Sequence, residues 1–260
     1  MHAAALFPLL LSELAIGIAA LLGFLSIERE TARFFKFHSL VAAACWVLVS
    51  ILVAGQARYP YLGFGIVCLC AWAQFRGGRL FKGKMWLSLA AGLGLAFGVT
   101  GLARGYPGSL PAGCPVGLGF WFFSRIYAGV PLIAVAYMAF AFAFASPGET
   151  IDAPGRLRTA LKMIPWFVLG RGLWSLAILG IAAGKAPEWT RAFLASGFGT
   201  AAGASFLFVR VGAGLALPAF LAVSLLRNMP AKDPRTERTS VLLLCVAVVM
   251  GELLALMLGF

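Results

Sequence analysis

Long apolar runs separated by short polar stretches repeat along the whole chain. The runs are apolar on every face, and most hold about twenty residues, the length that an α-helix needs to cross a hydrocarbon core about 30 Å thick; the third, at 61–75, is shorter. A barrel strand would need only about ten residues of alternating polarity. We therefore predict an all-α, polytopic integral membrane helix bundle that forms one transmembrane domain over residues 1–260. The predicted spans are about 4–26, 36–55, 61–75, 85–103, 117–145, 163–183, 198–226 and 240–259.

The amino-acid composition also indicates a membrane environment. Hydrophobic residues make up 62% of the chain and charged residues 12%, whereas soluble domains hold about 45–50% and 25%. The first twelve residues contain no Lys or Arg, so we expect the first apolar run to stay as a helix and not to be removed as a signal peptide. Lipid is therefore the expected surroundings of most of the chain.

The basic residues indicate the orientation of the helices. Of the 21 Lys and Arg residues, fourteen fall in the first, third, fifth and seventh connections, four in the others, and three inside spans. Cytoplasmic connections retain Lys and Arg. This alternation predicts about eight transmembrane helices in a cell inner membrane, with the N- and C-termini outside. The same alternation indicates that the net charge of +12 serves contact with the membrane surface and not binding of nucleic acid.

Five ionisable residues interrupt the apolar runs: Glu13, Arg125, Arg171, Arg210 and Glu252. Each costs roughly 2.5–3.5 kcal/mol at the centre of a membrane helix, so these side chains are expected to face the bundle interior. In the predicted topology all of them lie at a similar depth, roughly 12–18 Å from the outer helix ends at 1.5 Å per residue. We predict one polar layer. Its functional and structural interpretations, a ligand site or ion pairs that fix helix packing, both stay open.

Aromatic residues accompany the arginines in this layer. Tyr127 follows Arg125 by two positions, and Trp174 follows Arg171 by three. Aromatic rings beside cations suit a flat ring ligand, although the same rings are also typical of an interfacial belt. We therefore take Arg125, Tyr127, Arg171, Trp174 and Arg210 as a candidate quinone or anion layer. Glu13 and Glu252 are the candidate proton-handling residues.

Metal and haem sites are not expected. The five cysteines mostly lie inside apolar runs, and Cys68 and Cys70 are two positions apart, which places them on different helix faces. Of the two histidines only His38 lies near a span, so haem held by two histidines is not expected. We interpret His38 as a solvated or helix-end residue, with a proton-handling role as the alternative.

Three local motifs give a family resemblance. They are the first helix with Pro8-Leu-Leu-Leu-Ser-Glu-Leu-Ala-Ile-Gly17, the element Ser124-Arg-Ile-Tyr127, and the closing helix with Gly251-Glu-Leu-Leu254. With the eight-helix topology, they resemble the anchor subunits of membrane molybdopterin oxidoreductases: the dimethyl-sulfoxide-reductase anchor and the wider polysulfide-reductase NrfD-like group. The resemblance implies an eight-helix bundle that exchanges electrons between quinone and an iron–sulfur partner, usually without haem of its own.

We therefore expect a non-haem membrane anchor and quinone-interacting subunit of a multisubunit respiratory oxidoreductase complex. Quinone is the expected cofactor, and iron–sulfur or cytochrome subunits and lipids are the expected partners. The alternatives are a lipid-phosphate enzyme or small-anion transporter that uses the Arg and Glu layer, and a structural scaffold subunit. No connection is long enough to hold a catalytic domain.

Overall fold

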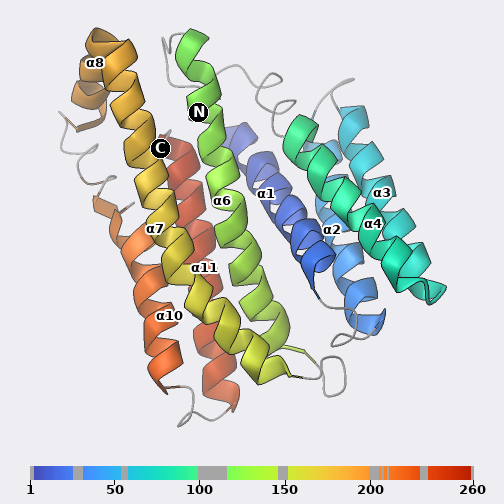
Figure 1. The fold of residues 1–260 in the computed structure, drawn as a ribbon. Coiled ribbons are helices and arrows are strands. Elements are labelled where there is room, and N and C mark those ends of the chain that lie inside the picture. Colours follow the sequence, from blue (N-terminus) through green and yellow to red (C-terminus); the bar gives the residue numbers. More distant parts are fainter. Residues whose placement is uncertain are drawn as a thin grey trace.

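The computed structural model describes residues 3–25, 32–53, 58–98, 116–145, 152–198, 205, 208–209, 211–228 and 234–258. The described residues form helices and no β-strand. The long helices run up and down beside one another (Figure 1), so most of the backbone polar groups bond within their own segment, as lipid requires. The predicted all-α class is confirmed.

The helices of the first half of the chain are α1 (Ala3–Phe24), α2 (Ala32–Leu52), α3 (Tyr59–Arg76) and α4 (Leu80–Leu93), and α4 continues as the π-helical turn η2 (Gly94–Gly98). Those of the second half are α6 (Val116–Ala143), α7 (Ala153–Lys185), α8 (Pro187–Phe198), the π-helical turn η3 (Gly212–Ala216), α10 (Leu217–Asn228) and α11 (Pro234–Leu258). A helix lies over the described part of every predicted span, although α4, α7 and α11 begin well before the predicted residue.

Several helices are long and apolar enough to cross a membrane. Four described segments reach that length: Phe7–Phe24, Ala32–Leu52, Ala153–Lys185 and Arg238–Leu256. Large apolar side chains cover the outside of the bundle, among them Trp166 at 73% exposure. In water such a surface would be costly, and in lipid it is the expected one. The chain is therefore a membrane protein.

Two elements differ from the sequence prediction. Helix α7 begins at Ala153 and not near residue 163, because Asp152 caps it: its Oδ1 accepts a hydrogen bond of 2.9 Å from the Gly155 amide. Helix α8 occupies a stretch that was predicted to be a connection. It carries polar residues such as Glu188 and Arg191, so a search for long apolar runs overlooks it.

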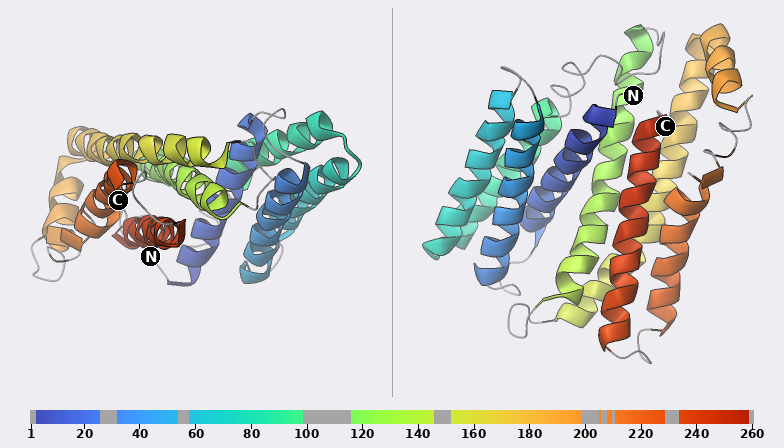
Figure 2. Two further views of the ribbon diagram at one scale, coloured as in Figure 1. Left: turned by 90° about the horizontal axis from the view of Figure 1, so that it is seen from below. Right: turned by 180° about the vertical axis from the view of Figure 1, so that it is seen from behind.

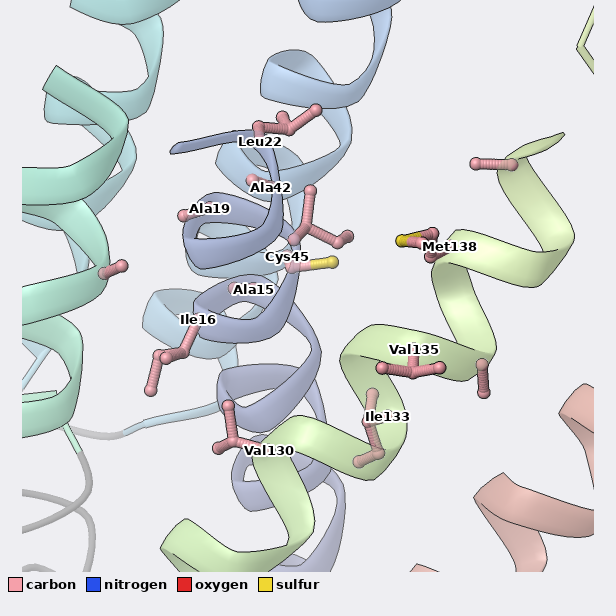
Figure 3. Close-up of a cluster of buried hydrophobic side chains, with 14 of the residues drawn as sticks. Ala15, Ile16, Ala19, Leu22, Ala42, Cys45, Val130, Ile133, Val135 and Met138 are labelled. Atoms are coloured by element: carbon pink, nitrogen blue, oxygen red, sulfur yellow. The ribbon is translucent and has the colours of Figure 1, made fainter. Parts of the chain in front are cut away.

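The helices form two groups that meet at α1 and α6. Helices α1–α4 make one group, and α6, α7, α10 and α11 make the other (Figure 2). Small residues allow the close approach of α1 and α6, because a Cβ placed on Gly17 would lie 3.0 Å from the Cβ of Ala134. Figure 3 shows buried side chains here, including Ala15, Val130 and Met138. The seam between the two groups is thus tightly packed.

Basic side chains stabilise helix ends at one end of the bundle. Helices α1 and α6 end here, and helices α2, α4, α7 and α11 begin here (Figure 1). Lys84 Nζ donates to the carbonyl of Leu25, directly after α1, over 2.5 Å. Arg238 Nε donates to the carbonyl of Ala143, the last residue of α6, over 3.1 Å. Cations at helix C-termini satisfy free carbonyls and complement the helix dipole.

Candidate functional site

A buried ion pair joins α7 to α11. Arg171 Nη2 lies 2.7 Å from Glu252 Oε2, and the two side chains are 1% and 0% exposed. Removing each ion from water costs several kcal/mol, which a short, charge-assisted hydrogen bond offsets in part. The second oxygen of Glu252, Oε1, is buried and accepts no hydrogen bond within the described part of the chain. Glu252 therefore keeps an acceptor position inside the bundle.

Glu13 brings a second carboxylate to the same place from α1. Glu13 is fully buried. A Cβ built on Gly129 of α6 would lie 2.7 Å from Glu252 Oε2 and 3.2 Å from Glu13 Oε1. The two oxygens are therefore separated by no more than the sum of these distances. At such a separation, and in a low effective dielectric, two negative charges repel strongly. The Arg171 guanidinium, 2.7 Å from Glu252 Oε2, offsets part of this repulsion.

Four helices thus meet at one point, each through one residue: Glu13 from α1, Gly129 from α6, Arg171 from α7 and Glu252 from α11. We call these four residues the buried charge cluster. Gly129 makes the arrangement possible, because any larger residue would occupy the space of the Glu252 carboxylate. The cluster lies where the two helix groups meet, since α1 belongs to one group and the other three helices to the second (Figure 2).

The π-helical turn η3 packs against α11, the helix that carries Glu252. A Cβ on Gly251, the neighbour of Glu252, would lie only 2.6 Å from the Cα and 2.8 Å from the carbonyl oxygen of Gly214. Pro218 has no amide hydrogen to donate to that carbonyl, four residues before it. The backbone of η3 therefore lies directly against α11 at the residue that precedes Glu252. Single π-helical turns of this kind are frequent at functional sites.

Trp174 belongs to the same helix as Arg171. It follows Arg171 by about one turn of α7 and is 37% exposed. Its Nε1 donates a hydrogen bond of 3.1 Å to Ser124 Oγ on α6. The bond ties Trp174 of α7 to α6, and part of the indole stays exposed on the bundle.

The structure brings together three of the seven residues that the sequence selected, namely Glu13, Arg171 and Glu252. Trp174 lies about one helical turn after Arg171 on α7. Arg125 and Tyr127 belong to α6, but their side chains lie outside the described residues, as does Arg210. That these three side chains face the cluster stays a prediction. Sequence reasoning missed Gly129, whose only sign was its place one turn after Arg125, and it missed the contact between Gly251 and η3.

His38 is buried, so its interpretation as a solvated residue is wrong. It is 6% exposed on α2. Its Nδ1 lies 2.6 Å from the hydroxyl of Tyr137 on α6, and the ring centroid of Phe34 lies 4.2 Å from its own. The partner Tyr137 lies 99 residues away in the sequence, which is why local reasoning could not find the pair. A proton-handling role for His38 stays a prediction.

Chemically, the buried charge cluster can hold hydrogen-bonding groups and protons. A guanidinium donates hydrogen bonds to a carbonyl or an anion, and a carboxylate accepts a proton or a hydroxyl hydrogen bond. Among the described residues, no group of three or more His, Cys, Asp and Glu residues is arranged to hold a metal ion.

Comparison with protein-family models, curated proteins and solved structures found no match for this chain.

Proposed function

We propose that this protein is the non-haem membrane anchor and quinone-interacting subunit of a multisubunit respiratory oxidoreductase complex. The observation that carries the proposal is the buried charge cluster, in which Arg171, Glu252 and Glu13 meet inside an apolar bundle. Ionisable groups inside membrane helices are costly, and a functional role is the default reason for keeping them. Glu252 Oε1 is buried and accepts no hydrogen bond among the described residues, which favours a ligand site over a closed structural contact.

The chemistry of quinone fits these groups. When a quinol is oxidised, it loses two protons and two electrons, and reduction of a quinone takes up the same number. In this proposal Glu13 and Glu252 exchange the protons, and Arg171 donates a hydrogen bond to a quinone oxygen and stabilises reduced, negatively charged forms. The ring of Trp174 provides a flat surface for the quinone head group.

In this proposal the chain holds no haem or metal of its own, so the electrons need a carrier on a partner subunit. We propose iron–sulfur or cytochrome subunits as partners, as the resemblance to the molybdopterin-oxidoreductase anchors implies. The connections between helices are too short to supply a catalytic domain within the chain. This part of the proposal rests on the resemblance and on the chain's architecture, and identification of co-purifying subunits tests it.

The proposed topology has about eight crossings of a cell inner membrane, with both termini outside. Its support comes from the basic residues. Lys and Arg are concentrated in alternate connections of the sequence, and Lys84 and Arg238 lie at one common end of the bundle. Helix α1 begins and helix α11 ends toward the opposite end in Figure 1. Cysteine labelling from either side of the membrane tests this orientation.

We predict that Glu252→Gln weakens quinone binding by about tenfold or more, because it removes a charge-assisted contact worth about 1.5–3 kcal/mol. The measurement is titration of the purified protein with decylubiquinone and with a menaquinone analogue, followed through tryptophan fluorescence. Glu188→Gln, which changes an exposed carboxylate on α8, is the matched control and should bind like the unchanged protein. Equal binding by all three proteins would contradict the proposal.

A structural scaffold subunit is the second candidate, and the ion pair itself favours it. A scaffold needs the buried charges to pair with each other, as Arg171 and Glu252 do. It predicts that Glu252→Gln changes the unfolding midpoint and leaves quinone binding unaltered. Extraction of bound small molecules separates the remaining alternatives, because a polyprenyl phosphate or an anion in place of quinone would favour the lipid-phosphate enzyme or the transporter.

A further inference from the structure

A groove opens between α1 and α4 at the basic end of the bundle. Its volume is about 760 Å³, within the range of roughly 300–1,000 Å³ typical of small-molecule sites. It lies away from the buried charge cluster. Its lining residues are Gly23, Phe81, Lys82, Lys84, Met85, Trp86, Ser88 and Leu89. We call it the α1–α4 groove.

The walls of the groove are apolar and accessible. Phe81, Met85 and Leu89 follow one another at intervals of four residues, so they form one stripe along α4. Their exposed fractions are 69%, 59% and 46%. The stripe therefore offers a continuous apolar track that runs along the helix, from the bundle end toward its middle. A long hydrocarbon chain is the natural match for such a track.

The end of the groove is positively charged, and one charge is fixed in place. Lys84 Nζ is held by its hydrogen bond to the Leu25 carbonyl, and an ammonium has two further hydrogens to donate. Lys82 also lines the groove and is exposed. A Cβ on Gly23 would lie 2.8 Å from Ser88 Oγ, so the hydroxyl of Ser88 lies against α1 at the base of the groove. These groups are donors suited to an anionic oxygen.

From this combination we infer that the α1–α4 groove binds an anionic phospholipid, with its phosphate at Lys82 and Lys84 and an acyl chain along Phe81, Met85 and Leu89. A free anion would leave the apolar stripe unused, and an uncharged lipid would leave the lysines unused. Basic pockets between membrane helices on the cytoplasmic side are suited to anionic head groups. The inference goes beyond the proposed function and does not depend on quinone binding.

Native mass spectrometry of the purified chain, with dioleoyl phosphatidylglycerol or dioleoyl phosphatidylcholine added to the micelles, tests the inference. Phosphatidylglycerol should remain bound at lower concentrations than phosphatidylcholine. Lys82→Gln should weaken retention of phosphatidylglycerol by about fivefold, the effect of one lysine near a lipid phosphate. Lys162→Gln, an exposed lysine of α7 outside the groove, should leave retention unchanged.

Two further probes separate the parts of the ligand. Dihexanoyl phosphatidylglycerol carries the same head group on short chains and should bind more weakly than the dioleoyl lipid, because it covers less of the apolar stripe. Inorganic phosphate at the same concentration should not compete. Equal retention of the two dioleoyl lipids, no effect of Lys82→Gln, or competition by inorganic phosphate would each overturn the inference.

Discussion

Arg171→Met should lower the free energy of unfolding by about 3–5 kcal/mol, because it leaves the Glu252 carboxylate buried without the cation that lies 2.7 Å away. Glu13 lies against the same glycine, so the repulsion between the two carboxylates would increase as well. The measurement is unfolding in mixed micelles by titration with sodium dodecyl sulfate. Arg158→Met, which changes an exposed arginine of the same helix, should alter the stability by less than about 0.5 kcal/mol.

The double variant Arg171→Met with Glu252→Leu isolates the charge effect from the packing effect. Replacing a complete buried ion pair by apolar residues of similar volume is often neutral or stabilising. We expect the double variant to regain most of the lost stability and still to bind quinone poorly. Recovery of both properties would favour the scaffold interpretation, and an Arg171→Met variant as stable as the unchanged protein would show that the pair contributes little.

Gly251→Ala should destabilise the protein by about 1–3 kcal/mol, the usual range for overpacking. The added Cβ would lie 2.6 Å from the Cα of Gly214 and 2.8 Å from its carbonyl oxygen. Both are backbone atoms, so no side-chain rotation relieves the overlap, and α11 must move away from η3. Because Glu252 is the next residue, we also expect weaker quinone binding.

The matched control is Gly180→Ala on α7, where an added Cβ has no atom within 4 Å. Alanine favours a helix over glycine by about 1 kcal/mol, so this variant should be as stable as the unchanged protein or slightly more stable. The same unfolding titration measures both variants. If Gly251→Ala matched Gly180→Ala, the close contact between α11 and η3 would have no role in positioning Glu252.

Prediction from the hydrophobic pattern failed at the start of α7, at α8 and around His38. A search for long apolar runs finds helices that face lipid on all sides, and it misses helical turns that contain polar residues. Asp152 and the polar residues of α8 were therefore assigned to connections. His38 was judged from its neighbours in sequence, Lys36 among them, while its burial depends on Phe34 and on Tyr137 of α6.

The sequence by itself determined the all-α class, the positions of the long helices and the rarity of charges within them. The physical reason is local, because a long apolar segment in lipid must satisfy its backbone hydrogen bonds internally and therefore forms a helix. Only the tertiary structure decided that Glu13, Arg171 and Glu252 meet and that Gly129 leaves them room. Which face a helix turns toward its neighbours depends on packing between segments far apart in the chain.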